Sequence, residues 1–157
     1  MWVLTRIFER TPSGLIAWVF SRTDVERVMS DLPADYKYTA EHEYLRPTDD
    51  PEVFVVGITD YAQGELGDVV FVELPSADAA FQKMDAFGTI EAVKAVSDLY
   101  CPVKAEVIGV NEALDDDPSL VNADPYGDGW MIRIRVADPA DVDALMDADA
   151  YRTHIAG

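Results

Sequence analysis

Short apolar runs that end at turn residues recur along this chain, and they restrict its fold more than any other feature. The runs are rich in β-branched and aromatic side chains and cover residues 53–58, 69–74, 105–110 and 130–136. In the last run, apolar residues alternate with Arg133 and Arg135, which predicts a strand with one buried face. Many short strands without β-α-β alternation predict a mainly β fold, a small barrel or sandwich.

Helix signals are fewer. Thr59 or Asp60 can cap a short helix that Gly67 ends. An aspartate–proline pair at residues 138–139 combines a cap with a proline at the first helical position. An apolar stripe with helical spacing follows at Val142, Leu145, Met146 and Tyr151. We therefore expect one C-terminal α-helix over about residues 139–152.

The first 28 residues differ from the remainder. They carry four arginines and three acids, whereas the rest of the chain is strongly acidic. We expect residues 1–28 to be an N-terminal extension, either a misassigned start or a disordered tail, and residues 29–157 to form the domain. The acids disfavour a mitochondrial presequence, so we expect the bacterial cytoplasm over the mitochondrial matrix.

The charge balance disfavours two classes of partner. Twelve Lys and Arg residues stand against 30 Asp and Glu residues, a formal net charge of −18. Nucleic acids and anionic membranes favour basic surfaces, so we expect neither as a partner. No apolar run approaches the ~18 residues that span a membrane. The only cysteine, Cys101, precludes an internal disulfide and fits a reducing compartment.

One lysine, Lys94, stands between two further apolar runs, residues 87–92 and 99–103. The pattern predicts two paired strands, and a short connection between paired strands projects into solvent. An exposed amine is protonated at neutral pH and is a poor catalyst, but a modifying enzyme can reach it from all sides. We therefore interpret Lys94 as an attachment point and the chain as a carrier.

The segment E-A-V-K-A-V around Lys94 resembles the lipoylation site of the glycine cleavage system H protein family. Further segments resemble the family in the same order, at residues 38–44, 57–63, 66–75 and 124–130. The similarity extends from about residue 32 to about residue 151. It implies the family's fold, the barrel-sandwich hybrid of lipoyl and biotinyl domains, with short helices and a C-terminal α-helix.

The resemblance also implies a cofactor and a set of partners. Lys94 would carry lipoate in amide linkage, attached by lipoyl-attaching enzymes. The arm would take an aminomethyl group from a pyridoxal-phosphate glycine decarboxylase to an aminomethyltransferase that uses tetrahydrofolate, and a dihydrolipoyl dehydrogenase would reoxidise it. The chain would be a monomeric carrier in glycine catabolism and one-carbon metabolism, with no catalytic residue of its own, and its tethered arm would raise the effective concentration of the intermediate at each enzyme.

Three carboxylates match family positions near the lysine site. Glu91 precedes Lys94 by three residues, as does the acid that helps the lipoyl-attaching enzyme recognise its site. Glu43 and Asp98 match positions near the cleft where the loaded arm docks, and carboxylates there could hold a cationic arm by charge-assisted hydrogen bonds. His42 matches a family histidine, for which we favour a structural role because no metal-ligand or nucleophile cluster surrounds it.

The chain departs from the family pattern at several positions. Ala92 replaces a serine two residues before the lysine, and Tyr44 replaces a tryptophan. Met84 stands where glycine is common before Asp85, a position at which glycine often provides a positive φ. None of these departures alters the lysine itself.

Two other functions remain open. A biotinyl carrier shares the fold, but it would have methionines beside its lysine, where this chain has Val93 and Ala95. An H-like lipoyl relay or scaffold outside glycine cleavage would need the same lysine, so the motifs do not exclude it. An enzyme in its own right is disfavoured, since the sequence shows no nucleophile–base pair and no metal-ligand cluster.

Overall fold

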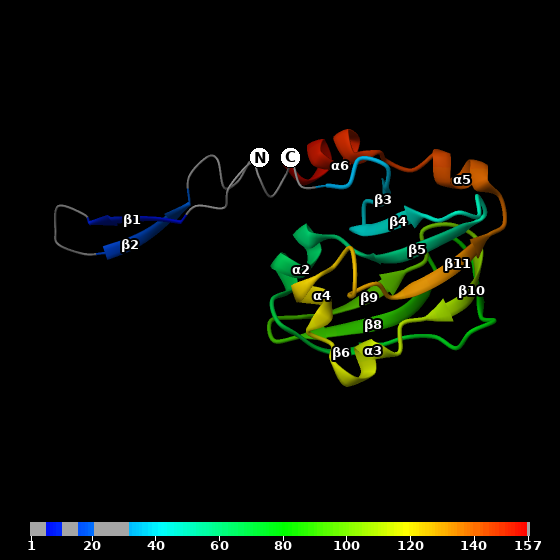
Figure 1. The fold of residues 1–157 in the computed structure, drawn as a ribbon, viewed down its shortest axis with the longest axis horizontal. Helices are drawn as coiled ribbons and strands as arrows, with labels where there is room; N and C mark the ends of the chain where they lie inside the picture. Colours follow the sequence, from blue (N-terminus) through cyan, green and yellow to red (C-terminus); the bar gives the residue numbers. More distant parts are fainter. Residues whose placement is uncertain (1–5, 11–15, 21–31, 157) are drawn as a thin grey trace.

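The computed structural model describes residues 6–10, 16–20 and 32–156 of the 157-residue chain. Two antiparallel sheets form the body of the molecule (Figure 1). The larger sheet has the strand order β3 (Lys37–Tyr38), β4 (Glu43–Pro47), β5 (Val53–Ile58), β11 (Ile132–Val136), β10 (Ala105–Val110) and β7 (Ala80–Phe81). The smaller sheet has the order β6 (Val69–Glu73), β8 (Ala86–Ala92) and β9 (Val96–Tyr100).

The core lies between the two sheets, as the alternating sequence pattern predicts. In β11, Ile132, Ile134 and Val136 are buried, while Arg133 and Arg135 face solvent. Side chains from both sheets join one apolar cluster that includes Val56, Val72 and Ile90. Burial of this cluster provides the main drive for folding. The two sheets themselves confirm the predicted mainly β class.

Short helices lie around the two sheets, with α6 beside the edge strand β3 (Figure 1). They are α2 (Asp60–Leu66), α3 (Ala113–Asp116), α4 (Leu120–Ala123), α5 (Pro139–Asp143) and α6 (Ala148–Ala156). The Thr59 hydroxyl accepts the Ala62 N–H at the start of α2, so the predicted N-cap is confirmed. Gly67 ends the same helix, also as predicted.

The predicted C-terminal helix is confirmed as α6, but its predicted bounds of residues 139–152 are wrong, because the region is divided between α5 and α6. Helix α5 ends at Asp143, and Met146 then pairs with Tyr38 as an isolated bridge. The Tyr38 N–H donates to the Met146 carbonyl at 2.8 Å, and the Met146 N–H donates back at 3.1 Å. Two backbone hydrogen bonds to an edge strand thus replace the continuation of the helix.

Two strands, β1 (Arg6–Arg10) and β2 (Ile16–Phe20), pair with each other in a sheet of their own, within the segment that the sequence analysis expects to be an extension. The rest of residues 1–28 lies outside the described residues.

Met84, which stands where the family commonly has glycine, has a φ of 72°. The backbone there thus keeps the left-handed conformation that glycine adopts easily.

Candidate functional site

Lys94 lies on the tip of the hairpin formed by β8 and β9. The connection is shorter than the sequence predicts, because β9 begins at Val96 and leaves a turn of residues 93–95. The Ala92 N–H donates to the Ala95 carbonyl at 2.8 Å and closes the turn. The second strand also ends earlier than predicted, at Tyr100, so Cys101 follows it.

The Lys94 side chain is exposed and runs along the end of α2. A Cβ atom added to Gly67 would lie 3.4 Å from both Cδ and Cε of Lys94. Gly67 also has a φ of 81°, a left-handed conformation that favours glycine. Among the described residues, Lys94 forms no ion pair with an acidic side chain. The amine is therefore free to react with an approaching enzyme.

A cavity of about 300 Å³ opens beside this turn, and it brings Glu43 and Asp98 together as the sequence analysis expects. Leu66 lines it and directly precedes Gly67, so the Lys94 stem lies next to the cavity wall. Four carboxylates line the cavity in total: Glu41, Glu43, Glu65 and Asp98. A cavity with this lining suits a cationic group better than a neutral or anionic one.

Glu43 is the buried member of the four, with only 2% of its surface exposed. The Tyr100 N–H donates to its Oε1 at 3.3 Å, and the Thr39 hydroxyl donates to its Oε2 at 3.5 Å. Burial raises the pKa of Glu43 to about 8, although the hydrogen bond from Tyr100 opposes this effect. The carboxyl is therefore largely protonated at neutral pH while no cation faces it.

His42 lines the cavity and also belongs to a hydrogen-bonded cluster that includes α6. Its Nδ1 lies 2.8 Å from the Tyr151 hydroxyl of α6, which in turn lies 2.8 Å from the Thr59 hydroxyl. The Tyr151 ring stacks on Tyr38 at 4.8 Å between centroids. Burial lowers the pKa of His42, and the adjacent His154 lowers it further. This cluster fixes α6 against one side of the site.

Glu91 lies outside the cavity, on the exposed face of β8. Its cross-strand partner is Val96, the first residue after the turn. The four predicted residues thus form two groups: Lys94 with Glu91 at the turn, and Glu43 with Asp98 in the cavity. Sequence reasoning missed Glu65 and Tyr61 as lining residues, although their spacing of four in a capped helix signals a shared face.

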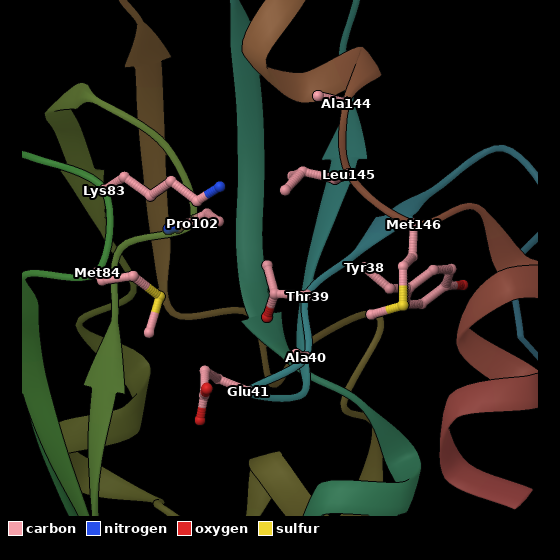
Figure 2. Close-up of a pocket in the computed structure, with 10 residues that line it drawn as sticks. All are labelled: Tyr38, Thr39, Ala40, Glu41, Lys83, Met84, Pro102, Ala144, Leu145 and Met146. Carbon is pink, nitrogen blue, oxygen red and sulfur yellow. The ribbon is translucent and has the colours of Figure 1, made fainter. Parts of the chain in front are cut away.

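A second cavity, of about 200 Å³, lies between the β3–β4 connection, the segment before β8 and the α5–α6 connection (Figure 2). Its lining is mostly apolar, with Lys83 and Glu41 as its charged residues. It contains none of the four predicted residues, so we place the candidate site at the first cavity and its turn.

Two further chemistries find no support in the described part of the chain. No group of three or more His, Cys, Asp or Glu residues among residues 32–156 is placed to hold a metal ion. The Cys101 thiol is fully buried and donates to the Val103 carbonyl, and burial raises its pKa to about 11, so it stays protonated.

No described helix has the length and apolar character to cross a membrane.

Comparisons of the sequence with known proteins all indicate one family. The family model for the glycine cleavage H-protein matches residues 36–156. A glycine cleavage system H protein of Mycolicibacterium gilvum is 53% identical over 132 residues, which cover 82% of this chain and 99% of the relative. A probable glycine cleavage system H protein of Natronomonas pharaonis is 53% identical over 126 residues, which cover 80% of this chain and 98% of the relative.

A solved structure shows the same fold. The crystal structure of a glycine cleavage system H protein from Mycobacterium marinum superposes with a TM-score of 0.72 at 34% sequence identity. The match covers 80% of this chain and all of the solved chain. The two sheets described above are thus a barrel-sandwich hybrid.

Proposed function

Since the chain belongs to the glycine cleavage H-protein family, the lipoyl carriers of the glycine cleavage system, we propose that Lys94 is the residue that carries lipoate. Proteins of this family carry lipoate on a lysine and catalyse no reaction themselves. Their partners are the glycine decarboxylase, the aminomethyltransferase and the dihydrolipoyl dehydrogenase of the system.

The position of Lys94 at the exposed tip of a three-residue turn carries this proposal. Lipoate needs a primary amine that an attaching enzyme can approach, and the Lys94 amine has no ion-pair partner among the described residues. When bound there, the lipoyl group supplies sulfur chemistry that takes up an aminomethyl group and later gives it to the aminomethyltransferase. The chain itself positions the arm and its load.

We further propose that the cavity holds the loaded arm through Glu43 and Asp98. An arm that bears an amine is cationic, and the four carboxylates of the cavity attract a cation. Glu43 gives up its proton when the cation arrives, because a nearby positive charge lowers the pKa of a buried carboxyl. The apolar wall that includes Leu66 and Ile90 excludes water from the other side of the arm.

Mass spectrometry of the protein from a host that lipoylates its carriers tests the attachment. We expect a lipoyl-sized mass increment on the peptide that contains Lys94 and no increment on that peptide in a Lys94→Arg variant. A biotin-sized increment, or a lipoyl group on Lys83 or Lys104 instead, would contradict the proposal. An unmodified Lys94 would favour an H-like scaffold outside glycine cleavage.

The lipoylated protein then tests the pathway and the cavity in two assays. With glycine and the three partner enzymes, we expect turnover that Lys94→Arg abolishes, whereas a relay outside glycine cleavage would give none. Without the aminomethyltransferase, we expect Asp98→Asn to release the one-carbon unit as formaldehyde about tenfold faster than the wild type, because one carboxylate of the cavity is lost. Equal release from Asp98→Asn and from the exposed control Asp128→Asn would contradict the docking role.

We propose the bacterial cytoplasm as the compartment. One cysteine and no possible internal disulfide fit a reducing environment. Cell fractionation with an antibody to the chain checks this location, and recovery with mitochondria would contradict it.

A further inference from the structure

Helix α2 forms one wall of the cavity proposed to hold the arm, although none of its seven residues is buried. Four of its residues line the cavity: Tyr61, Ala62, Glu65 and Leu66. A helix this short is marginal in water on its own, so contacts at its ends decide where it lies. At the C-terminal end, the Asn122 amide donates to the Gly67 carbonyl and to the Gln63 side-chain oxygen, each at 2.9 Å.

The contacts at the N-terminal end of α2 lead to the C-terminal helix, α6. The Thr59 hydroxyl caps α2 by accepting the Ala62 N–H at 3.2 Å, and it lies 2.8 Å from the hydroxyl of Tyr151. Thr59 and Tyr151 are both fully buried, so water is no alternative partner for either hydroxyl. A side chain 92 positions further along the sequence thus holds the cap of α2 in place.

The same Tyr151 hydroxyl also holds His42, which lines the cavity directly before Glu43. It lies 2.8 Å from Nδ1 of His42. His42 has a φ of 72°, a left-handed conformation that costs free energy outside glycine and persists where the surroundings hold it. A tyrosine hydroxyl can donate one hydrogen bond and accept another, so it can satisfy His42 and Thr59 together.

We propose that Tyr151 is a positioning residue for the cavity: through Thr59 and His42 it fixes α2 and the start of β4, the walls that shelter the loaded arm. This inference rests on the proposals that Lys94 carries lipoate and that the cavity holds the arm. Tyr151 is not among the residues that line the cavity, so it acts through those that do. Without its hydroxyl, the two walls separate more readily and water reaches the load of the arm.

Tyr38→Phe is a matched control for the test variant Tyr151→Phe. The two rings stack with 4.8 Å between their centroids, and both are fully buried. The Tyr38 hydroxyl donates instead to the Pro33 carbonyl at 2.7 Å. Each variant therefore keeps its ring and loses one buried hydroxyl, but Tyr151→Phe alone removes the contacts to Thr59 and His42. A purely structural role predicts the same effects in both variants.

Hydrogen exchange of the unlipoylated full chain, followed by NMR, gives the first readout. We expect Tyr151→Phe to speed exchange of the Ala62, Gln63 and Gly67 amides about fivefold or more, because a lost buried hydrogen bond eases local opening of α2. We expect Tyr38→Phe to leave these amides within about twofold of the wild type. Urea denaturation and circular dichroism verify that both variants are folded.

Release of the one-carbon unit from lipoylated protein gives the second readout. Glycine and glycine decarboxylase load the arm, and formaldehyde is then followed without the aminomethyltransferase, in a step that takes up water and also frees ammonia. We expect Tyr151→Phe to release formaldehyde about fivefold faster than the wild type, and Tyr38→Phe to match the wild type. The KM of the decarboxylase for both variants should be unchanged, because the exposed turn that carries the arm is intact.

Equal exchange of the α2 amides in the two phenylalanine variants would overturn the positioning role. Release from folded Tyr151→Phe at the wild-type rate would overturn it as well, whatever the exchange of α2. Failure of the proposed function looks different. In that case wild-type Lys94 would take no lipoyl group, or Asp98→Asn would release formaldehyde no faster than its exposed control.

Discussion

At the scale of single residues, the two carboxylates proposed for the cavity occupy opposite environments. Glu43 is buried and accepts hydrogen bonds from Tyr100 and Thr39, whereas Asp98 is exposed. The sequence pointed to both through family resemblance, but it contains no local sign of which one is buried. That difference arises only when β9 and the start of β4 meet across the cavity.

The buried Glu43 makes stability depend on pH. Its pKa of about 8 in the folded state exceeds the usual value of a glutamate, so the native state holds a proton that the unfolded state loses. Its contribution is therefore fully present below about pH 4.5 and is lost as pH rises to about 8. Between pH 4.5 and pH 9, we expect the free energy of unfolding of the wild type to fall by roughly 2–5 kcal/mol more than that of Glu43→Gln. The variant has no carboxyl at this position, so it lacks this loss.

Urea unfolding followed by tryptophan fluorescence at both pH values measures this difference. The matched control is Glu106→Gln, an exposed glutamate of β10, which should show the same pH dependence as the wild type. A Glu43→Gln variant that loses stability in parallel with the wild type between the two pH values would show that Glu43 ionises freely in the folded protein.

At the scale of elements, the sequence predicted those features that depend on neighbouring residues. The Thr59 cap and Gly67 correctly predicted the two ends of α2, and the alternation around Arg133 correctly predicted the buried face of β11. The predictions failed where a distant partner decides. Residues 96–98 are exposed and carry no strand pattern, yet pairing with β8 makes them a strand, and the bridge between Tyr38 and Met146 interrupts the C-terminal helix.

Close approach of β8 to β6 requires a glycine at position 88. A Cβ atom there would lie 2.1 Å from the Glu73 carbonyl oxygen, which belongs to the backbone and cannot rotate away. We expect Gly88→Ala to reduce the free energy of unfolding by about 2–4 kcal/mol. Gly64 in α2 is the control, because its added Cβ would meet nothing within 4 Å, and Gly64→Ala should stabilise by about 0.5–1 kcal/mol.

Chemical denaturation of the two alanine variants beside the wild type compares them directly. Because both replace glycine with alanine, any shared effect on the unfolded chain cancels in the comparison. Equal stability changes of one sign would contradict the close approach of the two strands.

At the scale of the whole molecule, the net charge of −18 constrains both partners and stability. Charge also organises the proposed site, since four carboxylates line the cavity proposed to hold the arm. Composition alone predicted the acidic surface. It could not predict that one buried carboxyl would stay largely protonated, because that depends on the fold.

Mutual repulsion among so many acids opposes compaction, and dissolved ions screen it. We expect the melting temperature to rise by about 3–8 °C between about 0.02 M and about 0.5 M NaCl, measured by circular dichroism at neutral pH. The control is Asp115→Lys/Asp116→Lys, two exposed positions in α3, which changes the net charge from −18 to −14 because each substitution adds two units. Its melting temperature should be higher at low salt and rise less with added salt. A wild-type melting temperature that is constant or falls over this range would show that the acids are already balanced by their local partners.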